Sequence, residues 1–160
     1  MPEISPGKTG LPSQNKVIHT VLGFDFGAKR IGIAVGQTLT SSATPLQTLN
    51  NVNDKPDWQR IEALLNEWKP EALVVGLPYL LDGKATEMTL RADKFSRRLH
   101  GRFGLPVFTV SETLSSFEAE EQLKQTKKID KQNKHEIDKL AAALITETWL
   151  QQQYDKNNQP

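Results

Sequence analysis

The sequence predicts an α/β fold with a mixed five-stranded sheet, made of a three-strand meander followed by two strand–helix units and flanked by helices. Two observations predict it. Short β-branched and apolar runs, separated by turn residues, dominate the chain from residue 17 to residue 49. Beyond residue 57, segments with helical periodicity alternate with short apolar runs.

Three strands are expected first. Residues 17–26 become β-branched and apolar, and the short run 31–36 follows after a Gly-Ala-Lys-Arg connection, which indicates a hairpin. A third extended segment at 43–49 continues the meander up to the polar break 50–57.

The middle of the chain is expected to form a helix and then a strand–helix unit. Residues 57–68 carry apolar side chains at three- and four-residue spacing, which is typical of an amphipathic helix. Residues 72–75 form a short apolar strand before the Gly- and Pro-bearing loop 76–83, and residues 86–100 resume a helical pattern.

A second strand–helix unit and a last helix follow. Residues 105–110 are strand-like, and Ser115 followed by Glu118 has the pattern of a capping box that opens a helix. The Lys- and Asn-rich stretch 126–136 is expected to be a loop. Residues 138–153 form an amphipathic helix whose apolar face can lie on the sheet.

Composition fits one domain in a reducing compartment. The 160 residues suffice for a single core, expected at 17–152 between a flexible polar tail at 1–16 and a polar tail at 153–160. The absence of cysteine excludes disulfides and cysteine-bound zinc. No apolar run approaches the roughly 20 residues that span a bilayer, so we expect a soluble, cytoplasmic protein without a membrane partner.

Three acidic residues are the candidate site. Asp25 lies among apolar residues of a predicted central strand, where an unpaired carboxylate is costly, although it could face the surface or pair with Lys29 or Arg30. Glu112 follows a strand at the end where open α/β sheets build their sites, but it could be a solvated loop residue. Asp138 could equally cap the last helix.

Together the three acids have the chemistry of a metal site. Mg²⁺ takes oxygen ligands and is usually held by one or two carboxylates and substrate phosphate. Two ions about 3.5 to 4 Å apart can activate the attacking water and stabilise the leaving oxygen of a phosphodiester. In such a site Asp25 could bridge both ions while Glu112 and Asp138 each hold one, with Glu118 and Glu136 as neighbours of the ligands.

Four runs of the chain resemble a known family. In order and spacing, the YqgF (RuvX) family of ribonuclease H-like proteins is matched by LGFDFGAKRIGIAVG, VVGLPYLLDG, VSETLSSFEAE and IDKLAAALITETWL. The resemblance covers nearly all of residues 21–150. It implies a ribonuclease H-like fold similar to that of Holliday junction resolvases, with Asp25, Glu112 and Asp138 at the family's acidic positions.

The resemblance also implies a function. Members are expected to be metal-dependent nucleases, with Mg²⁺ or Mn²⁺, that trim the 5′ end of precursor 16S ribosomal RNA in the bacterial cytoplasm. The sequence departs from the family where Ser111 and Thr113 flank Glu112, in place of an acid and an arginine, and where Leu80 replaces a frequent asparagine. These changes could alter contacts with substrate without touching the three acids.

Basic residues are the candidate nucleic-acid contacts. Net charge is only +1, from 20 basic and 19 acidic side chains, so their distribution matters more than their number. Some follow the first acid, some share one helix face and some lie in the Lys-rich stretch before the last acid. The candidates are Lys29, Arg30, Arg91, Lys94, Arg98, Lys127, Lys128, Lys131 and Lys134. Each group could also be an ordinary solvated surface.

Aromatic residues and histidines add little. Trp58, Trp68 and Trp149 lie on apolar helix faces and are expected in the core, whereas Tyr79 could stack on a base. The histidines form no general-base arrangement, and only His135, near Asp138, is a candidate for mutation.

Other functions remain open on sequence alone. They are cleavage of branched DNA as a Holliday junction resolvase, nucleic-acid binding without catalysis, and phosphate transfer of the actin and sugar-kinase type, which one short domain makes improbable. The sequence leaves open RNA or DNA as substrate and a monomer or a homodimer.

Overall fold

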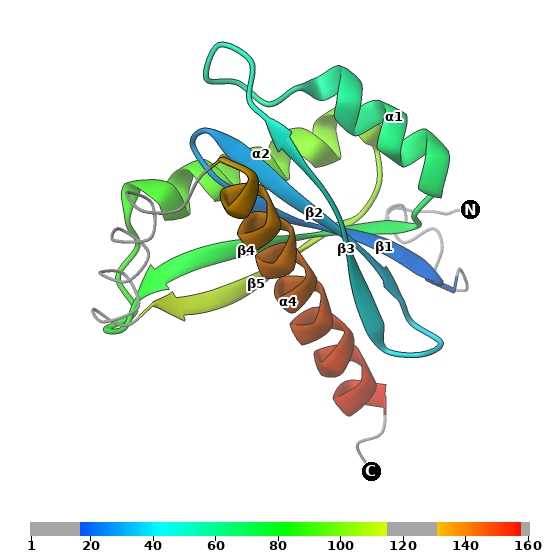
Figure 1. Ribbon diagram of the computed structural model, residues 1–160. Coiled ribbons are helices and arrows are strands. Elements are labelled where there is room, and N and C mark those ends of the chain that lie inside the picture. Colours follow the sequence, from blue (N-terminus) through cyan, green and yellow to red (C-terminus); the bar gives the residue numbers. More distant parts are fainter. Residues whose placement is uncertain (1–16, 115–130, 158–160) are drawn as a thin grey trace, which may run out of the picture.

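The computed structural model describes residues 17–114 and 131–157. Its first three strands are β1 (Thr20–Phe26), β2 (Arg30–Gln37) and β3 (Ser42–Asn50). Each pairs antiparallel with the next, as the sequence predicted. Figure 1 shows them as the blue and cyan part of the sheet.

Two further strands complete the sheet. Both β4 (Ala72–Leu80) and β5 (Val107–Leu114) run parallel to β1, and the strand order is β3-β2-β1-β4-β5. A five-stranded mixed sheet flanked by helices confirms the predicted fold class.

Strands β4 and β5 are longer than predicted. We expected residues 76–83 to form a loop, but β4 continues to Leu80 because it pairs with β5 along that length. Beyond Val75 the strand has no partner in β1, and proline, which cannot donate a backbone hydrogen bond, is tolerated where a strand is paired on one side only. Pro78 therefore does not end the strand. The same pairing places Glu112 inside β5, near its carboxyl end, rather than after it.

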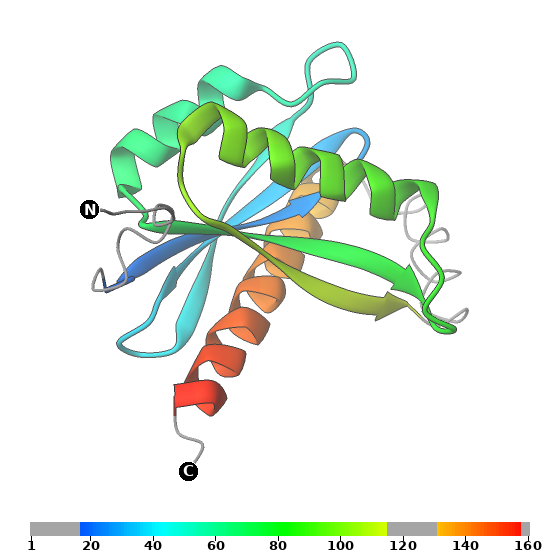
Figure 2. The same cartoon turned by 180° about the vertical axis from the view of Figure 1, so that it is seen from behind.

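Two helices cover one face of the sheet. Helix α1 (Trp58–Trp68) is capped by Asp57, whose side chain accepts a hydrogen bond from the Arg60 backbone N–H. Helix α2 (Glu87–Phe103) begins with a capping box between Thr86 and Thr89 and ends at Gly104, whose φ of 71° suits glycine. Figure 2, seen from behind, shows both helices in front of the sheet.

The third described helix, α4 (Lys131–Asn157), crosses the other face. We expected a loop at 126–136 and a helix over 138–153, yet residues 131–136 and 154–157 are helical too, so the predicted bounds of this helix are wrong. The first turns are held by hydrogen bonds from β3 to His135, and the last contain a bond from Gln151 to Asp155. The expected tail at 1–16 and the helix opened by Ser115 lie outside the described residues.

The core has a cluster on each side of the sheet. On the α1 and α2 side, Phe24 and Phe95 are fully or almost fully buried, and Trp58 and Trp68 pack against their cluster. On the α4 side, Trp149 is buried in the second cluster. The three tryptophans therefore belong to the core, as predicted. No helix within residues 17–114 and 131–157 is both long and apolar enough to cross a membrane.

Small residues let α4 lie close to the sheet. A Cβ at Gly23 would overlap the Thr146 hydroxyl of α4, and a Cβ at Gly36 would come within 2.6 Å of the methyl group of the same residue. Ala34, which pairs with Gly23, packs against alanines of the helix. This close approach brings the polar start of α4 to the edge of the site described next.

Candidate metal centre

The carboxylate of Asp25 lies on the face of the sheet that α4 covers. Successive side chains of a strand point to opposite faces. Gly23 faces Thr146 of α4, and Asp25 is two residues further along β1. Phe24 and Phe26, in contrast, contact the ring of Phe95 on α2.

Glu112 reaches the same face from β5. A Cβ at Gly76 would lie 3.1 Å from Glu112 Oε1 and 2.6 Å from Ile145 Cδ1 of α4. The missing side chain of Gly76 therefore makes room for the carboxylate beside the helix. Ser111 and Thr113, which depart from the family pattern, are exposed on either side of Glu112.

Asp138 is brought over the sheet by α4. A Cβ at Gly32 would overlap the backbone oxygen of Asp138, and Gly32 is the register partner of Asp25. The helix backbone at Asp138 thus lies directly above this strand pair. Asp138 stands well after the first residue of α4, Lys131, so it does not cap the helix.

Two of the carboxylates act on the third. Burial, together with the negative charges of Glu112 and Asp138, raises the pKa of Asp25 from 3.8 to about 7. Burial also raises the pKa of Glu112. Three neighbouring acids in a partly buried place form an oxygen-only donor set that a divalent cation would neutralise. In chemistry and charge the residues fit Mg²⁺ or Mn²⁺.

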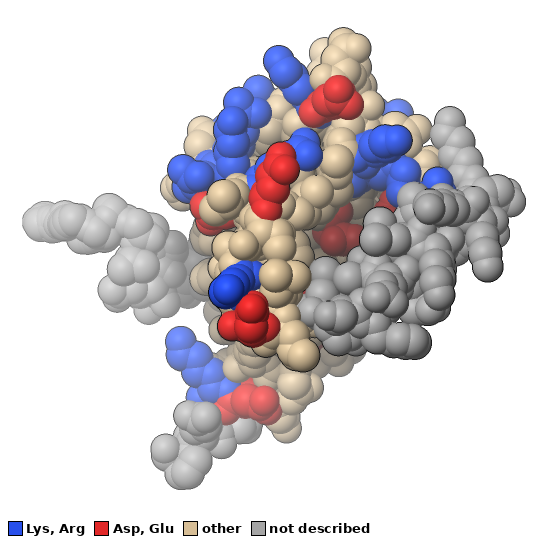
Figure 3. All heavy atoms as spheres, turned by 90° about the vertical axis from the view of Figure 1, so that its left-hand side faces the viewer, with Lys and Arg blue, Asp and Glu red and all other residues tan. Residues whose placement is uncertain are grey.

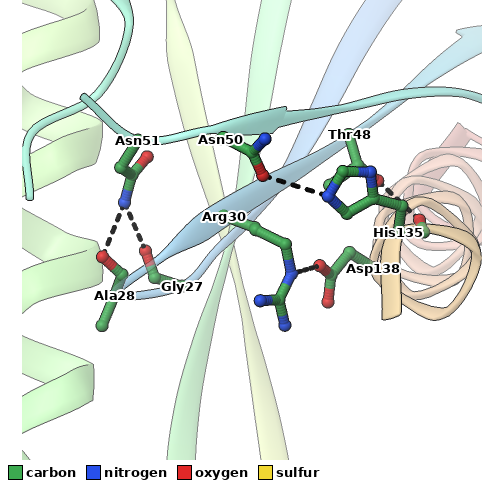
Figure 4. Close-up of polar contacts among 8 residues, drawn as sticks. All are labelled: Gly27, Ala28, Arg30, Thr48, Asn50, Asn51, His135 and Asp138. Carbon is green, nitrogen blue, oxygen red and sulfur yellow. Dashed lines mark hydrogen bonds and ion pairs between the residues drawn. The ribbon is translucent and has the colours of Figure 1, made fainter. Parts of the chain in front are cut away.

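The three carboxylates are not arranged around a single point. Within residues 17–114 and 131–157, no group of three Asp, Glu or His side chains has the spacing needed to hold a metal ion. Instead, Arg30 Nε donates a hydrogen bond to Asp138 Oδ2 at 2.6 Å, and both side chains are mostly buried (Figure 4). We considered a pairing of Arg30 with Asp25; its partner is Asp138. The ion pair partly neutralises the acidic cluster.

Side chains from the end of β3 complete the surroundings. Asn51 Nδ2 donates to the carbonyl oxygens of Gly27 at 3.1 Å and Ala28 at 2.7 Å, and so fixes the connection between β1 and β2 (Figure 4). His135 on α4 bonds to Asn50 and Thr48. Sequence reasoning treated residues 50–57 as a polar break and gave no signal for these contacts.

The predicted basic contacts fall in different places. Arg91 lies on α2, with its guanidinium carbon 5.9 Å from the centre of the Phe26 ring, and Lys94 and Arg98 are exposed on the same helix. Lys29 is exposed in the connection between β1 and β2, and Lys134 is partly buried near the start of α4. Outside the described residues or side chains lie Lys127, Lys128, Lys131 and Glu118.

Two other candidates are placed by the structure. Glu136 is exposed, and its carboxylate pairs with Lys139 Nζ at 3.2 Å, one residue beyond Asp138. Tyr79 is partly buried on β4, in the stretch paired with β5.

Comparisons with known proteins match nearly the whole chain. The family model RuvX, described as Holliday junction resolvase, matches residues 19–152. A Pseudomonas aeruginosa protein named "Putative pre-16S rRNA nuclease" is 48% identical over 144 residues, which are 89% of this chain and 99% of the relative. An Azotobacter vinelandii protein of the same name is 50% identical over 130 residues, which are 81% of this chain and 92% of the relative.

Solved structures give more distant matches. T. thermophilus RuvC in complex with a Holliday junction substrate has a TM-score of 0.37 and 19% identity, covering 58% of this chain and 64% of that one. With matched motifs along almost its entire described length, and with close to half of its residues shared with curated relatives, the chain belongs to the RuvX family.

Proposed function

We propose that this chain is a divalent-metal-dependent nuclease that hydrolyses phosphodiester bonds in precursor 16S ribosomal RNA, near its 5′ end, in the cytoplasm. The observation that carries the proposal is the approach of three carboxylates from β1, β5 and α4: burial, with the charges of Glu112 and Asp138, raises the pKa of Asp25 to about 7. The family description and the names of the relatives bear out the predicted enzyme class, a nuclease.

Asp25 is the central residue of the proposed centre. It is opposed electrostatically by both Glu112 and Asp138, so a cation between them relieves the largest repulsion at Asp25. Glu112 and Asp138 would hold the ion together with Asp25, and Arg30, which pairs with Asp138, would share that carboxylate with it. Bound Mg²⁺ or Mn²⁺ would supply an activated water and charge stabilisation for the leaving oxygen.

Basic side chains of α2 are the proposed contacts with the nucleic-acid backbone. Lys94 and Arg98 are exposed and have no ion-pair partner within residues 17–114 and 131–157. A shallow depression of about 430 Å³ on this helix is lined by Lys94, Arg97, Arg98, Gly101 and Arg102. Arg97 pairs with Asp93, but the other three basic side chains stand near one another on this helix, an arrangement that favours an anionic ligand.

The arrangement of charge supports binding of a long substrate. Figure 3 shows Lys and Arg side chains gathered over the upper part of the face that it presents, with acidic side chains among them. Because α2 and the acids lie on opposite faces of the sheet, a nucleic acid that contacts both would have to pass around an edge of the sheet. The other proposed contacts are Lys29, Arg30, Arg91, Lys127, Lys128, Lys131 and Lys134.

Branched DNA is the second candidate substrate, because the family model is described as a Holliday junction resolvase. Symmetric cutting of a junction requires two active sites, and hence a homodimer, whereas trimming of RNA is possible for a monomer. The mass of the protein in solution, with and without each substrate, separates these arrangements.

The test is cleavage of labelled precursor RNA and of four-way DNA junctions by the unaltered chain and by Asp25→Asn, with Mg²⁺, with Mn²⁺ and with chelator. We expect metal-dependent cutting of the RNA that Asp25→Asn abolishes. The matched control is Asp155→Asn, the same chemical change near the far end of α4, which should cut normally. Binding without cutting under any metal would leave only a non-catalytic binding module.

A further inference from the structure

Two neighbouring residue pairs of β2 and β3 hold the part of α4 that carries Asp138. Arg30 pairs with Asn50 in the sheet register, and Gly32 pairs with Thr48. Residues two apart on a strand share a face, so all four lie on the face that α4 covers. The two β2 residues, Arg30 and Gly32, contact Asp138 of α4. The two β3 residues, Asn50 and Thr48, contact a single other residue of the same helix.

That residue is His135. Thr48 Oγ1 donates a hydrogen bond to the His135 carbonyl oxygen at 2.6 Å, and His135 Nε2 lies 3.0 Å from Asn50 Oδ1 (Figure 4). An amide oxygen only accepts hydrogen bonds, so Nε2 carries the proton and donates it. Strand β3 thus fixes both the backbone and the ring of one helix residue.

Asp138 is held from β2 in the same double manner. Gly32 contacts its backbone directly, and Arg30 Nε donates to its carboxylate. Residues three apart on a helix are neighbours on one face, so His135 and Asp138 move together when the helix turns or slides. Figure 4 shows the His135 and Asp138 side chains on the side of α4 that faces Asn50 and Arg30.

We infer that His135, Asn50 and Thr48 are positioning residues for the metal centre: they set the place of the Asp138 carboxylate and thereby its affinity for a divalent ion. The inference rests on the proposed function. In this arrangement His135 acts through its Nε2–H, which donates to Asn50. The metal centre is thus tuned from β3, a strand that supplies none of its three acids.

The size of the effect follows from known metal sites. Residues that orient a ligand typically change metal affinity by about 10- to 100-fold when they are altered. Here the contacts act through a helix turn rather than on the carboxylate itself. We therefore expect the lower end, about a tenfold loss of affinity for Mn²⁺.

The experiment is calorimetric titration of Mn²⁺ into the full chain without nucleic acid. His135→Ala and Asn50→Ala should each weaken binding about tenfold, and the double variant should lose no more than either one, because both remove the same hydrogen bond. His135→Gln, whose amide can still donate to Asn50, should recover affinity. Thr48→Val, which keeps the shape of the side chain, separately tests the bond to the helix backbone.

A matched control lies on the same helix. Gln151→Ala removes the hydrogen bond to Asp155, and Mn²⁺ affinity should not change. In cleavage assays, the Mn²⁺ concentration for half-maximal rate should rise in His135→Ala while the rate at saturating Mn²⁺ stays the same.

Two negative results are distinguishable. If His135→Ala, Asn50→Ala and Thr48→Val bind Mn²⁺ as the unaltered chain does, and only their thermal midpoints fall, the contacts merely stabilise α4 and the inference is wrong. If the unaltered chain binds no Mn²⁺ at all, the proposed metal centre is wrong and the inference falls with it.

Discussion

Arg30 Nε donates a hydrogen bond to Asp138 Oδ2 at 2.6 Å, across 108 residues of sequence. The positively charged Arg30 side chain therefore already binds one of the three carboxylates that we propose as metal ligands. Without metal, Arg30 offsets part of the repulsion among the acids. With metal, it competes for Asp138.

Removal of this cation should lower stability most when metal is absent. Arg30→Gln breaks a mostly buried charged hydrogen bond, so the free energy of unfolding in chelator should fall by about 1.5–3 kcal/mol. Added Mn²⁺ should then stabilise Arg30→Gln more than the unaltered chain, because no arginine has to be displaced. Urea denaturation with chelator and with Mn²⁺ measures both effects.

The control for Arg30→Gln is Arg97→Gln. Arg97 pairs with Asp93 at 3.1 Å, but the two side chains are 72% and 46% exposed. A pair so accessible to solvent contributes little, and Arg97→Gln should change the free energy of unfolding by less than about 1 kcal/mol. If the free energy of unfolding fell equally in the two variants, the Arg30–Asp138 pair would stabilise the chain no more than an exposed ion pair does.

The raised pKa of Asp25 should appear in the pH dependence of the free energy of unfolding. Its pKa is about 7 in the folded chain and near 3.8 when exposed, so the folded state holds the proton more tightly. This contribution is fully present below pH 4 and is lost as the pH rises through about 7, amounting to at most roughly 4 kcal/mol. In chelator, Asp25→Asn should therefore be more stable than the unaltered chain at pH 8, and the difference should shrink at pH 5.

Urea denaturation of both chains at the two pH values tests this sign. A lower stability of Asp25→Asn at pH 8 would show that Asp25 is already compensated in the folded chain. Asp155→Asn, at an exposed position, should show no such dependence on pH.

Metal binding should compete with the proton on Asp25. Below about pH 7 the carboxyl of Asp25 is protonated in the metal-free chain, and Mn²⁺ has to displace that proton. Affinity for Mn²⁺ should fall by up to tenfold for each pH unit below 7. Calorimetry at pH 6 in buffers of different ionisation enthalpy should detect release of about one proton; a heat independent of the buffer would contradict this.

The close packing of α4 on the sheet should depend on Gly32. Gly32→Ala places a methyl group against the backbone of Asp138, so the helix must shift, at a cost of about 1–3 kcal/mol and with weaker Mn²⁺ binding. Gly101→Ala is a control of opposite sign. Nothing lies within 4 Å of its Cβ, and alanine in helix α2 should stabilise the chain by about 0.5–1 kcal/mol. Thermal and urea denaturation compare the two.

Nucleic-acid binding should lose one phosphate contact when the α2 surface is altered. In the Asp25→Asn chain, we expect Arg98→Ala to make the slope of log binding constant against log salt concentration less steep by about one. Lys156→Ala removes the same charge at the far end of α4 and should have no effect. Fluorescence anisotropy at several salt concentrations gives the slopes, and identical slopes would exclude α2 from the interface.

Much of the fold could be read from the sequence because the patterns are local. Alternation and helical spacing located β1, β2, β3 and α1 to within a few residues. The errors came from pairing with remote strands. Neither the extension of β4 through Pro78 nor the early start of α4 can be seen without β5 and β3.

Part of the site could also be predicted from the sequence, and part could not. Asp25, Glu112 and Asp138 stood out by the chemistry of three acids and by their motifs, and the structure brings them within electrostatic reach. The pairing of Arg30 with Asp138 and the contact of His135 with Asn50 could not be foreseen, because they depend on the register that sets residue 30 opposite residue 50. Asn50 was assigned to a polar break because its partner, His135, lies 85 residues away in the sequence.

The order in which the chain is synthesised gives the glycine-lined contact with α4 a further meaning. Asp25 and Glu112 leave the ribosome before the helix that carries Asp138. The surface formed by Gly23, Gly32 and Gly36 waits for that helix, and the three carboxylates meet only when it docks. In a nascent chain the proposed centre is therefore incomplete until α4 has been synthesised and packed on the sheet.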